Sequence, residues 1–215
     1  MPGDDALRAE IVAACRRLDA RGLIAGADGN VSARLPDGRI LITPRGAFKG
    51  DLDPAGLAVV DPDGQGVARN HHASSEVRMH VRIYRRRPDV HAIVHAHPPT
   101  ATAFAVAGED FMTPVLPELV AQMGGVPLVP YATPGSDLLA DQFEPFLPHH
   151  DAFLMANHGA TTVGPTLAIA QQRMESLEHA ARILLAARQV GRVRPLSDAD
   201  AAVLLAAARA ARGTA

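Results

Sequence analysis

Three histidines, His95, His97 and His158, stand at or near the ends of apolar segments, where they could bind a metal ion. The segment VHAIVHAHPP, residues 90–99, carries His91, His95 and His97. Alternate residues of a β-strand point to the same face, so we expect His95 and His97 side by side at the strand end. His158 follows a second apolar segment, and three neutral imidazoles can bind Zn²⁺ and leave a position open for a substrate. His91 lies further back and is expected inside the sheet, outside the metal site.

One carboxylate and the scarcity of lysine indicate which kind of catalysis these residues could perform. Glu76 stands in SSEVRMH at the start of an expected helix, where the helix dipole also favours an acid. There it would serve as a general base, or as a fourth metal ligand that swings away. Schiff-base chemistry needs a lysine amine, yet the only lysine is Lys49, in the polar, glycine-flanked segment RGAFKGD. We expect that amine to be solvated, so a metal is the expected electron sink for carbonyl chemistry.

Small polar loops indicate where an anionic group would bind. The segments GADGN (26–30) and TPRG (43–46) and the pair Ser74-Ser75 are rich in backbone donors. Such loops cradle phosphate or carboxylate groups, and a helix start adds a partial positive charge. Each loop taken alone is equally typical of an ordinary turn.

The elements that must position these residues follow from hydrophobic periodicity and turn residues. Helices are expected over residues 4–20, 74–87, 98–108, 118–123, 136–146, 166–191 and 196–211, with Ser74 as an N-cap. Strands are expected over 31–35 and 39–43 as a hairpin, and over 57–61, 90–97, 126–132 and 151–159, with a glycine turn after His158. Because strands alternate with helices but include a hairpin, we predict one α/β/α layered domain, residues 1–215, with a mixed or largely antiparallel sheet.

The bulk composition argues against several classes of function. The chain has 215 residues, is 47% hydrophobic and 20% charged, and carries a formal net charge of −2, so neither nucleic acid nor a membrane surface is an expected partner. No apolar run reaches membrane-spanning length, and the N-terminus has no signal-peptide pattern. The single cysteine, Cys15, cannot form an internal disulfide, which fits a reducing, cytoplasmic location.

Taken together, these segments resemble the class II aldolase/adducin-type family, whose members include L-fuculose-phosphate aldolase and L-ribulose-5-phosphate 4-epimerase. The matching pieces, in order, are GADGNVSAR (26–34), ITPRG (42–46), SSE (74–76), HAIVHAHPPTATA (91–103), PYATPGS (130–136) and NHG (157–159). The ordered set extends over nearly the whole chain and is far more specific than any single piece. The resemblance implies an α/β/α fold with a mainly antiparallel sheet, a Zn²⁺ site (or Mn²⁺ or another divalent ion), and a homotetramer with active sites between subunits.

The resemblance also assigns roles residue by residue. His95, His97 and His158 would be the metal ligands. Glu76 would be the catalytic acid/base, and a further metal ligand when no substrate is bound. The positions that hold the substrate phosphate in the aldolase are matched here by Asn30, Gly46, Ser74 and Ser75.

Three positions depart from the aldolase pattern. The guanidinium of Arg45 replaces the small hydroxyl of a TPTG or TPSG loop, and it can bind a phosphate or a carboxylate through two hydrogen bonds. Ala27 stands where a hydroxyl residue is usual. The segment that supplies a catalytic tyrosine from the next subunit is here VLPELVAQMGG, and Glu118 takes that place in an ungapped alignment, which makes it a candidate catalytic acid.

The residues and the resemblance together predict a zinc-dependent aldolase. It would cleave a C–C bond of a small hydroxy-ketone, such as a sugar phosphate, through a metal-stabilised enediolate. A glutamate at position 76, where the epimerase has aspartate, favours cleavage. Three alternatives stay open: a metal-dependent decarboxylase of a 3-oxo acid, favoured if Arg45 binds a carboxylate; an epimerase or dehydratase; and a non-catalytic, adducin-like interaction domain, which would not need the glutamate and histidines.

Overall fold

Seven strands form one sheet at the centre of the molecule. The computed structural model describes residues 4–67 and 72–213, so the ends of the expected 1–215 domain lie outside the described residues. The strands are β1 (Asn30–Arg34), β2 (Ile40–Ile42), β3 (Ala58–Val60), β4 (Ala92–Ala96), β5 (Leu128–Val129), β6 (Ala152–Met155) and β7 (Gly159–Gly164). Their order across the sheet is β3-β2-β1-β4-β7-β6-β5. Among the strands of the described residues, only the β5–β6 pair is parallel, which confirms the mixed, mainly antiparallel sheet.

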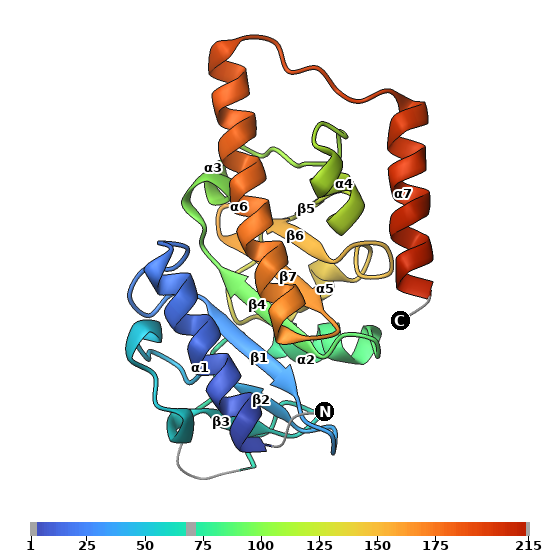
Figure 1. Ribbon diagram of the computed structural model, residues 1–215. Helices are drawn as coiled ribbons and strands as arrows, with labels where there is room; N and C mark the ends of the chain where they lie inside the picture. The colour runs from blue at the N-terminus through green and yellow to red at the C-terminus, as the bar shows by residue number, and fades with distance from the viewer. Residues whose placement is uncertain (1–3, 68–71, 214–215) are drawn as a thin grey trace.

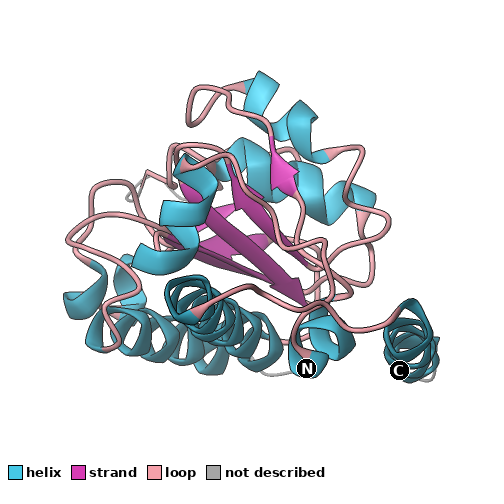
Figure 2. Ribbon diagram, turned by 90° about the horizontal axis from the view of Figure 1, so that it is seen from above, coloured by secondary structure: helices cyan, strands magenta, loops and turns pink. Residues whose placement is uncertain are grey.

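Helices cover both faces of this sheet (Figure 2). One face packs against α1 (Asp4–Ala20), α3 (Pro99–Val106) and α6 (Leu167–Val190), which lie in front of the sheet in Figure 1. The other face packs against α2 (Val77–Arg86) and α5 (Asp137–Phe143). Two further helices, α4 (Pro117–Met123) and α7 (Asp198–Gly213), pack against each other, and the 3-10 helices are η1 (Lys49–Asp51) and η2 (Pro54–Gly56). The α/β/α arrangement is therefore confirmed.

Strand β4 is the central strand, and its alternation decides which side the site lies on. Val94 belongs to the core under α1 and α6, whereas Ile93 belongs to the core under α2 and α5. His95 is two residues after Ile93 and so points to the same face, the face covered by α2. The start of α2 is therefore the segment that can approach His95.

The segment expected as one strand, 151–159, contains β6, a turn and the first residue of β7, and the prediction of a glycine turn after His158 was wrong. β6 ends at Met155, the chain turns through Asn157 with φ 56°, and Gly159 already belongs to β7. Asparagine tolerates this left-handed conformation better than most side chains. A side chain at position 159 would meet the carbonyl oxygen of Ala96 and Cδ2 of His97, both at 2.6 Å, so glycine lets β7 approach the site closely.

Other boundaries also differ from the predictions. α2 begins at Val77, because residues 74–76 form a turn in which the Glu76 N–H donates to Ser74 Oγ at 3.3 Å. Ser74 is therefore not the N-cap. The strand expected over 126–132 shrinks to Leu128–Val129. Among the described helices, none is both long and apolar enough to cross a membrane.

Candidate active site

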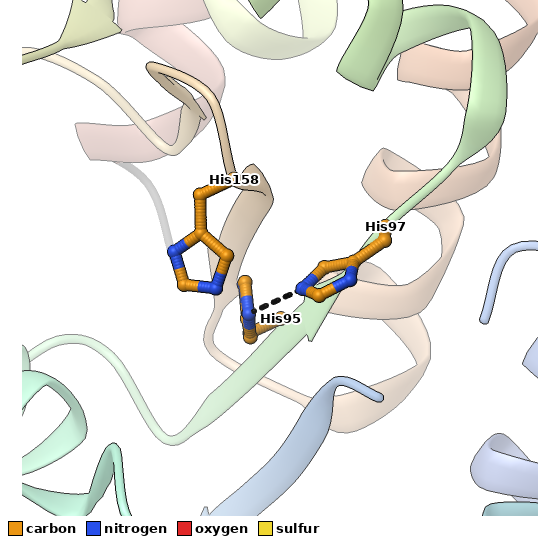
Figure 3. A group of neighbouring side chains, drawn as sticks. All are labelled: His95, His97 and His158. Carbon is orange, nitrogen blue, oxygen red and sulfur yellow. Dashed lines mark hydrogen bonds between the residues drawn. The ribbon is translucent and has the colours of Figure 1, made fainter. Parts of the chain in front are cut away.

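The three histidines of the sequence analysis meet at one end of the sheet. His95 lies near the end of β4 and His97 directly after it, while His158 lies in the turn between β6 and β7. Antiparallel pairing of β4 with β7 sets Ala96 opposite Ala160 and so brings the turn alongside. The three rings surround a common space (Figure 3), with ring centroids 4.8 to 5.1 Å apart.

The ring orientations leave nitrogens facing this space. His95 Nδ1–H donates to the carbonyl oxygen of Ala160 at 2.9 Å, which leaves Nε2 free to face the other rings. His97 Nδ1 lies 3.5 Å from Asp28 Oδ2, and its Nε2 lies 3.2 Å from Nε2 of His95. One nitrogen from each ring lies within 4.8 Å of the others. Such a ring-nitrogen set, with outer nitrogens held by a carbonyl and a carboxylate, fits a divalent metal site.

Glu76 supplies the carboxylate beside these rings. Its side chain is buried, and Oε2 accepts from Asn30 Nδ2 at 2.8 Å and lies 3.2 Å from His95 Nε2. Oε1 lies 3.5 Å from His158 Nε2 but has no hydrogen bond within the described part of the chain. The carboxylate is therefore anchored through one oxygen and available through the other.

Glu76 and His95 favour each other's charged forms, whereas the other two histidines of the cluster favour the neutral form. Burial disfavours charge on Glu76, but the neighbouring His95 outweighs it and lowers the pKa of the carboxyl below its usual range. Burial likewise opposes charge on His95, yet Glu76 raises the pKa of that imidazole. Burial, with the charge of His95 added, lowers the pKa of His158 to about 4 and also lowers the pKa of His97. A bound dication would displace the proton from the His95 nitrogen that faces the cluster, because a metal ligand must be the neutral imidazole.

A cavity of about 200 Å³ opens onto the cluster. The residues expected to contact substrate all line it, beside Glu76, His97 and His158: Asn30, Arg45, Gly46, Ser74 and Ser75. Two loops form its wall, held together because the Ser74 N–H donates to Thr43 O at 3.1 Å and the Arg45 N–H to His72 O at 3.0 Å. Asn30 and Ser74 are buried, whereas the side chain of Arg45 is exposed at the mouth.

Lys49 also lines this cavity, and the expectation that its amine is solvated was wrong. The residue is 2% exposed, and Nζ donates to the carbonyl oxygens of Ala27 at 2.9 Å and Ala47 at 2.8 Å. Helix η1 turns the side chain beneath the loop at residues 26–30, and burial lowers the pKa of the ammonium. The amine ties two cavity loops together through main-chain oxygens.

Other cavity and cluster residues were not predicted. Asp28 orients His97, and His80 contacts Asn30 from one helical turn after Glu76. The i, i+4 spacing of Glu76 and His80 was the available signal, since it places both on one side of a helix.

Two predicted residues lie elsewhere. Glu118 is exposed on α4 and is not among the residues that line the 200 Å³ cavity of its own chain. Its assigned role involved a neighbouring subunit. His91 lies outside the histidine cluster, but the expectation that it lies inside the sheet was wrong. It precedes β4, is half-buried and lines a separate cavity of about 680 Å³ between α1 and the start of α6.

Comparison with known proteins identifies the family. The class II aldolase and adducin N-terminal domain family matches residues 9–185. The chain belongs to this family. With its histidine cluster, it is a metal-dependent class II aldolase-family enzyme, and the non-catalytic alternative is set aside.

Individual relatives carry several activities. The 3-oxo-tetronate 4-phosphate decarboxylase of Escherichia coli K12 is 36% identical over 185 residues, which cover 84% of this chain and 87% of the relative. A 5-methylthioribulose-1-phosphate/5-deoxyribulose-1-phosphate aldolase of E. coli O45:K1 is 35% identical over 163 residues, 75% of each chain. The crystal structure of YgbL from E. coli superposes with a TM-score of 0.87 at 34% identity, covering 94% of this chain and 99% of that one. These similarities favour the decarboxylase alternative over the aldolase that the sequence analysis placed first.

Proposed function

We propose that this chain is a divalent-metal-dependent decarboxylase of a small phosphorylated 3-oxo acid. Similarity to a relative named for that reaction, over 84% of this chain, supports the substrate class. The metal proposed is Zn²⁺, because three imidazoles with an open position are its usual catalytic ligand set. His95, His97 and His158 would hold it.

One observation supports the proposal: a single small cavity is lined by polar turns that can bind a phosphate, by Arg45, which can bind a carboxylate, and by Glu76, which can transfer a proton. A phosphorylated 3-oxo acid has two anionic ends. The Ser74-Ser75 turn, Gly46 and Asn30 offer donors for the phosphate. The exposed guanidinium of Arg45, which has no ion pair among the described residues, would bind the carboxylate in a two-pronged contact.

The reaction follows from these contacts. The C–C bond to the carboxylate breaks, CO₂ leaves, and the bonding electron pair stays on the substrate as an enolate. A bound divalent cation would supply Lewis-acid stabilisation of this negative charge. Glu76 Oε1, the carboxylate oxygen without a hydrogen bond, would take up a proton from solvent and pass it to the carbon, which returns the group to the ionised state. Each turnover therefore consumes one proton.

Proton uptake separates decarboxylation from aldol cleavage, which is proton-neutral overall. Zinc-loaded enzyme would be given a four-carbon 3-oxo acid 4-phosphate in a pH-stat at mildly acidic pH. A stream of inert gas would carry the CO₂ away for parallel measurement, so that its hydration to bicarbonate does not return the proton. The same enzyme would be given a ketose 1-phosphate, with aldehyde release measured. We expect chelator-sensitive CO₂ release with matching proton uptake, abolished in Glu76→Gln. Aldehyde release without CO₂ would assign aldol cleavage instead, and inactivity of the metal-loaded enzyme on both substrates would refute the proposal.

We further propose that the chain forms a homotetramer in which Glu118 of one copy serves the cavity of the next. Its exposed position on α4 leaves the side chain available to a neighbouring subunit. The test is complementation: coexpressed Glu76→Gln and Glu118→Gln chains should regain activity that neither variant has alone, because some mixed sites contain both glutamates. A fully active monomer by light scattering would exclude shared sites.

A further inference from the structure

A line of buried hydrogen bonds runs from Glu76 into the interior between β1 and α2. Asn30 Nδ2 donates to Glu76 Oε2 at 2.8 Å, and Asn30 Oδ1 lies 2.5 Å from His80 Nε2. On the other side of its ring, His80 Nδ1 lies 2.6 Å from Ser32 Oγ, which lies 2.8 Å from the hydroxyl of Tyr84. His80 and Ser32 are fully buried, and Asn30 and Tyr84 nearly so.

The orientation of the Asn30 amide fixes the direction of the bonds in this line. Asn30 presents its NH₂ group to Glu76 and its oxygen to His80. That oxygen only accepts, so His80 must carry its proton on Nε2. His80 Nδ1 is then an acceptor and takes the hydroxyl hydrogen of Ser32, whose oxygen accepts from Tyr84.

Burial keeps His80 and Tyr84 in the protonation states that this line requires. Burial lowers the pKa of His80 to about 3, which leaves the imidazole neutral with one proton to place. Burial raises the pKa of Tyr84, so its hydroxyl stays a donor. Reversing the line would turn the Asn30 oxygen toward Glu76 Oε2 and lose the 2.8 Å hydrogen bond between these two residues.

We propose that His80, held as the Nε2–H tautomer, is a positioning residue for the catalytic glutamate. By occupying Asn30 Oδ1 it stops the amide from flipping, and the amide in turn holds Glu76 Oε2. The carboxylate then presents Oε1 to the cavity. His80 touches neither the cavity nor the metal cluster; it acts through Asn30. The kinetic part of the test rests on the proposed function, whereas the tautomer part does not.

The tautomer can be measured without substrate or metal. In ¹⁵N-labelled protein, long-range proton–nitrogen spectra distinguish a protonated from a bare ring nitrogen, and His80→Gln identifies the resonances by their loss. We expect His80 to carry its proton on Nε2, and the side-chain amide protons of Asn30 to exchange slowly. A His80 ring protonated on Nδ1 would overturn the proposal whether or not the enzyme is a decarboxylase.

Two substitutions at position 80 test the consequence for catalysis. His80→Met fills the space but offers no donor, so Asn30 should flip freely and its amide protons should exchange faster. We expect kcat to fall ~10–100-fold, the range typical for loss of an outer partner. Bound metal should be unchanged, and KM should change less than kcat, because Asn30 is only one of several donors proposed for the phosphate. His80→Gln retains an N–H near Nε2 and should recover much of the loss.

A stability control separates positioning from loss of structure. Thr162→Val removes another fully buried hydroxyl hydrogen bond, donated to Ala170 O at 2.7 Å, on the other face of the sheet. It should lower the free energy of unfolding and leave kcat unchanged. Equal kcat in His80→Met and wild type, or a loss in His80→Gln as large as in His80→Met, would reject the positioning role.

Discussion

Replacing Gly29 with alanine tests whether the loop before β1 must press against the metal-binding strand. Gly29 has φ +68°, and a Cβ there would lie 2.7 Å from the carbonyl oxygen of His95 and 3.1 Å from Cγ2 of Ile24. The carbonyl belongs to β4 main chain and cannot turn aside. The loop must therefore move, and Asn30 moves with it.

Gly26 provides a matched control in the same loop. It has φ +58°, but a Cβ there meets nothing within 4 Å. Both substitutions incur left-handed strain of roughly 1–2 kcal/mol, partly offset by ~0.4–1 kcal/mol of lost unfolded-chain entropy. Only Gly29→Ala adds an overlap, worth about 1–3 kcal/mol in a packed setting. We therefore expect Gly29→Ala to be less stable than Gly26→Ala by roughly 1–3 kcal/mol.

Urea unfolding of metal-free protein measures this difference directly, and zinc titration measures its effect on the site. For a chain of this size, each kcal/mol also lowers Tm by about 2–4 °C. Zinc affinity should weaken in Gly29→Ala and stay at the wild-type value in Gly26→Ala. Equal stability of the two variants would refute the argument, because they differ in the overlap that a Cβ at position 29 makes with β4 and Ile24.

Further predictions concern the cluster and the buried thiol. His95→Ala should lose both bound zinc and turnover, whereas Glu76→Gln should keep zinc and lose turnover. Metal analysis with parallel activity assays checks both variants. Retained activity in Glu76→Gln would contradict the role of Glu76 as the proton carrier. Zinc should raise the Tm of the wild type with increasing concentration, because it binds only the assembled site, and should not raise that of His95→Ala. Burial raises the pKa of Cys15 from 9.0 to about 12, so above pH 9 the unfolded chain loses this proton first. Above pH 9 the free energy of unfolding should fall with pH in both proteins, and the slope should be steeper in wild type than in Cys15→Ala by about 1.4 kcal/mol per pH unit. Equal slopes of unfolding free energy against pH would contradict this.

The metal cluster could be predicted because its geometry follows from local rules. Strand alternation set the side of β4 on which His95 lies, and strand ends set where His97 and His158 emerge. The layered fold could likewise be read from periodicity and one hairpin. Strand β7 was missed because its start depends on a left-handed Asn157, and a short stretch such as NHG looks the same in a turn and at a strand start.

The remaining site residues depend on contacts between distant segments. His80 becomes a neighbour of Asn30 only because β1 packs beneath α2, fifty residues later in the chain. The buried amine of Lys49 donates hydrogen bonds to main-chain carbonyl oxygens, and no pattern of side chains in the sequence indicates such partners. The role of Glu118 involves a second chain, so neither the periodicity nor the fold of one chain can place it.

The hydrogen bond from His95 to the carbonyl oxygen of Ala160 has a consequence for how this site can vary in evolution. A side-chain partner can be deleted by a single codon change, but every amino acid at position 160 carries the same carbonyl. The orientation of the imidazole is thus insulated from point mutation at that position and can be altered only by shifting strand β7 itself. The metal site can therefore stay constant while substitutions at surrounding cavity residues, such as Arg45, change which substrate is bound.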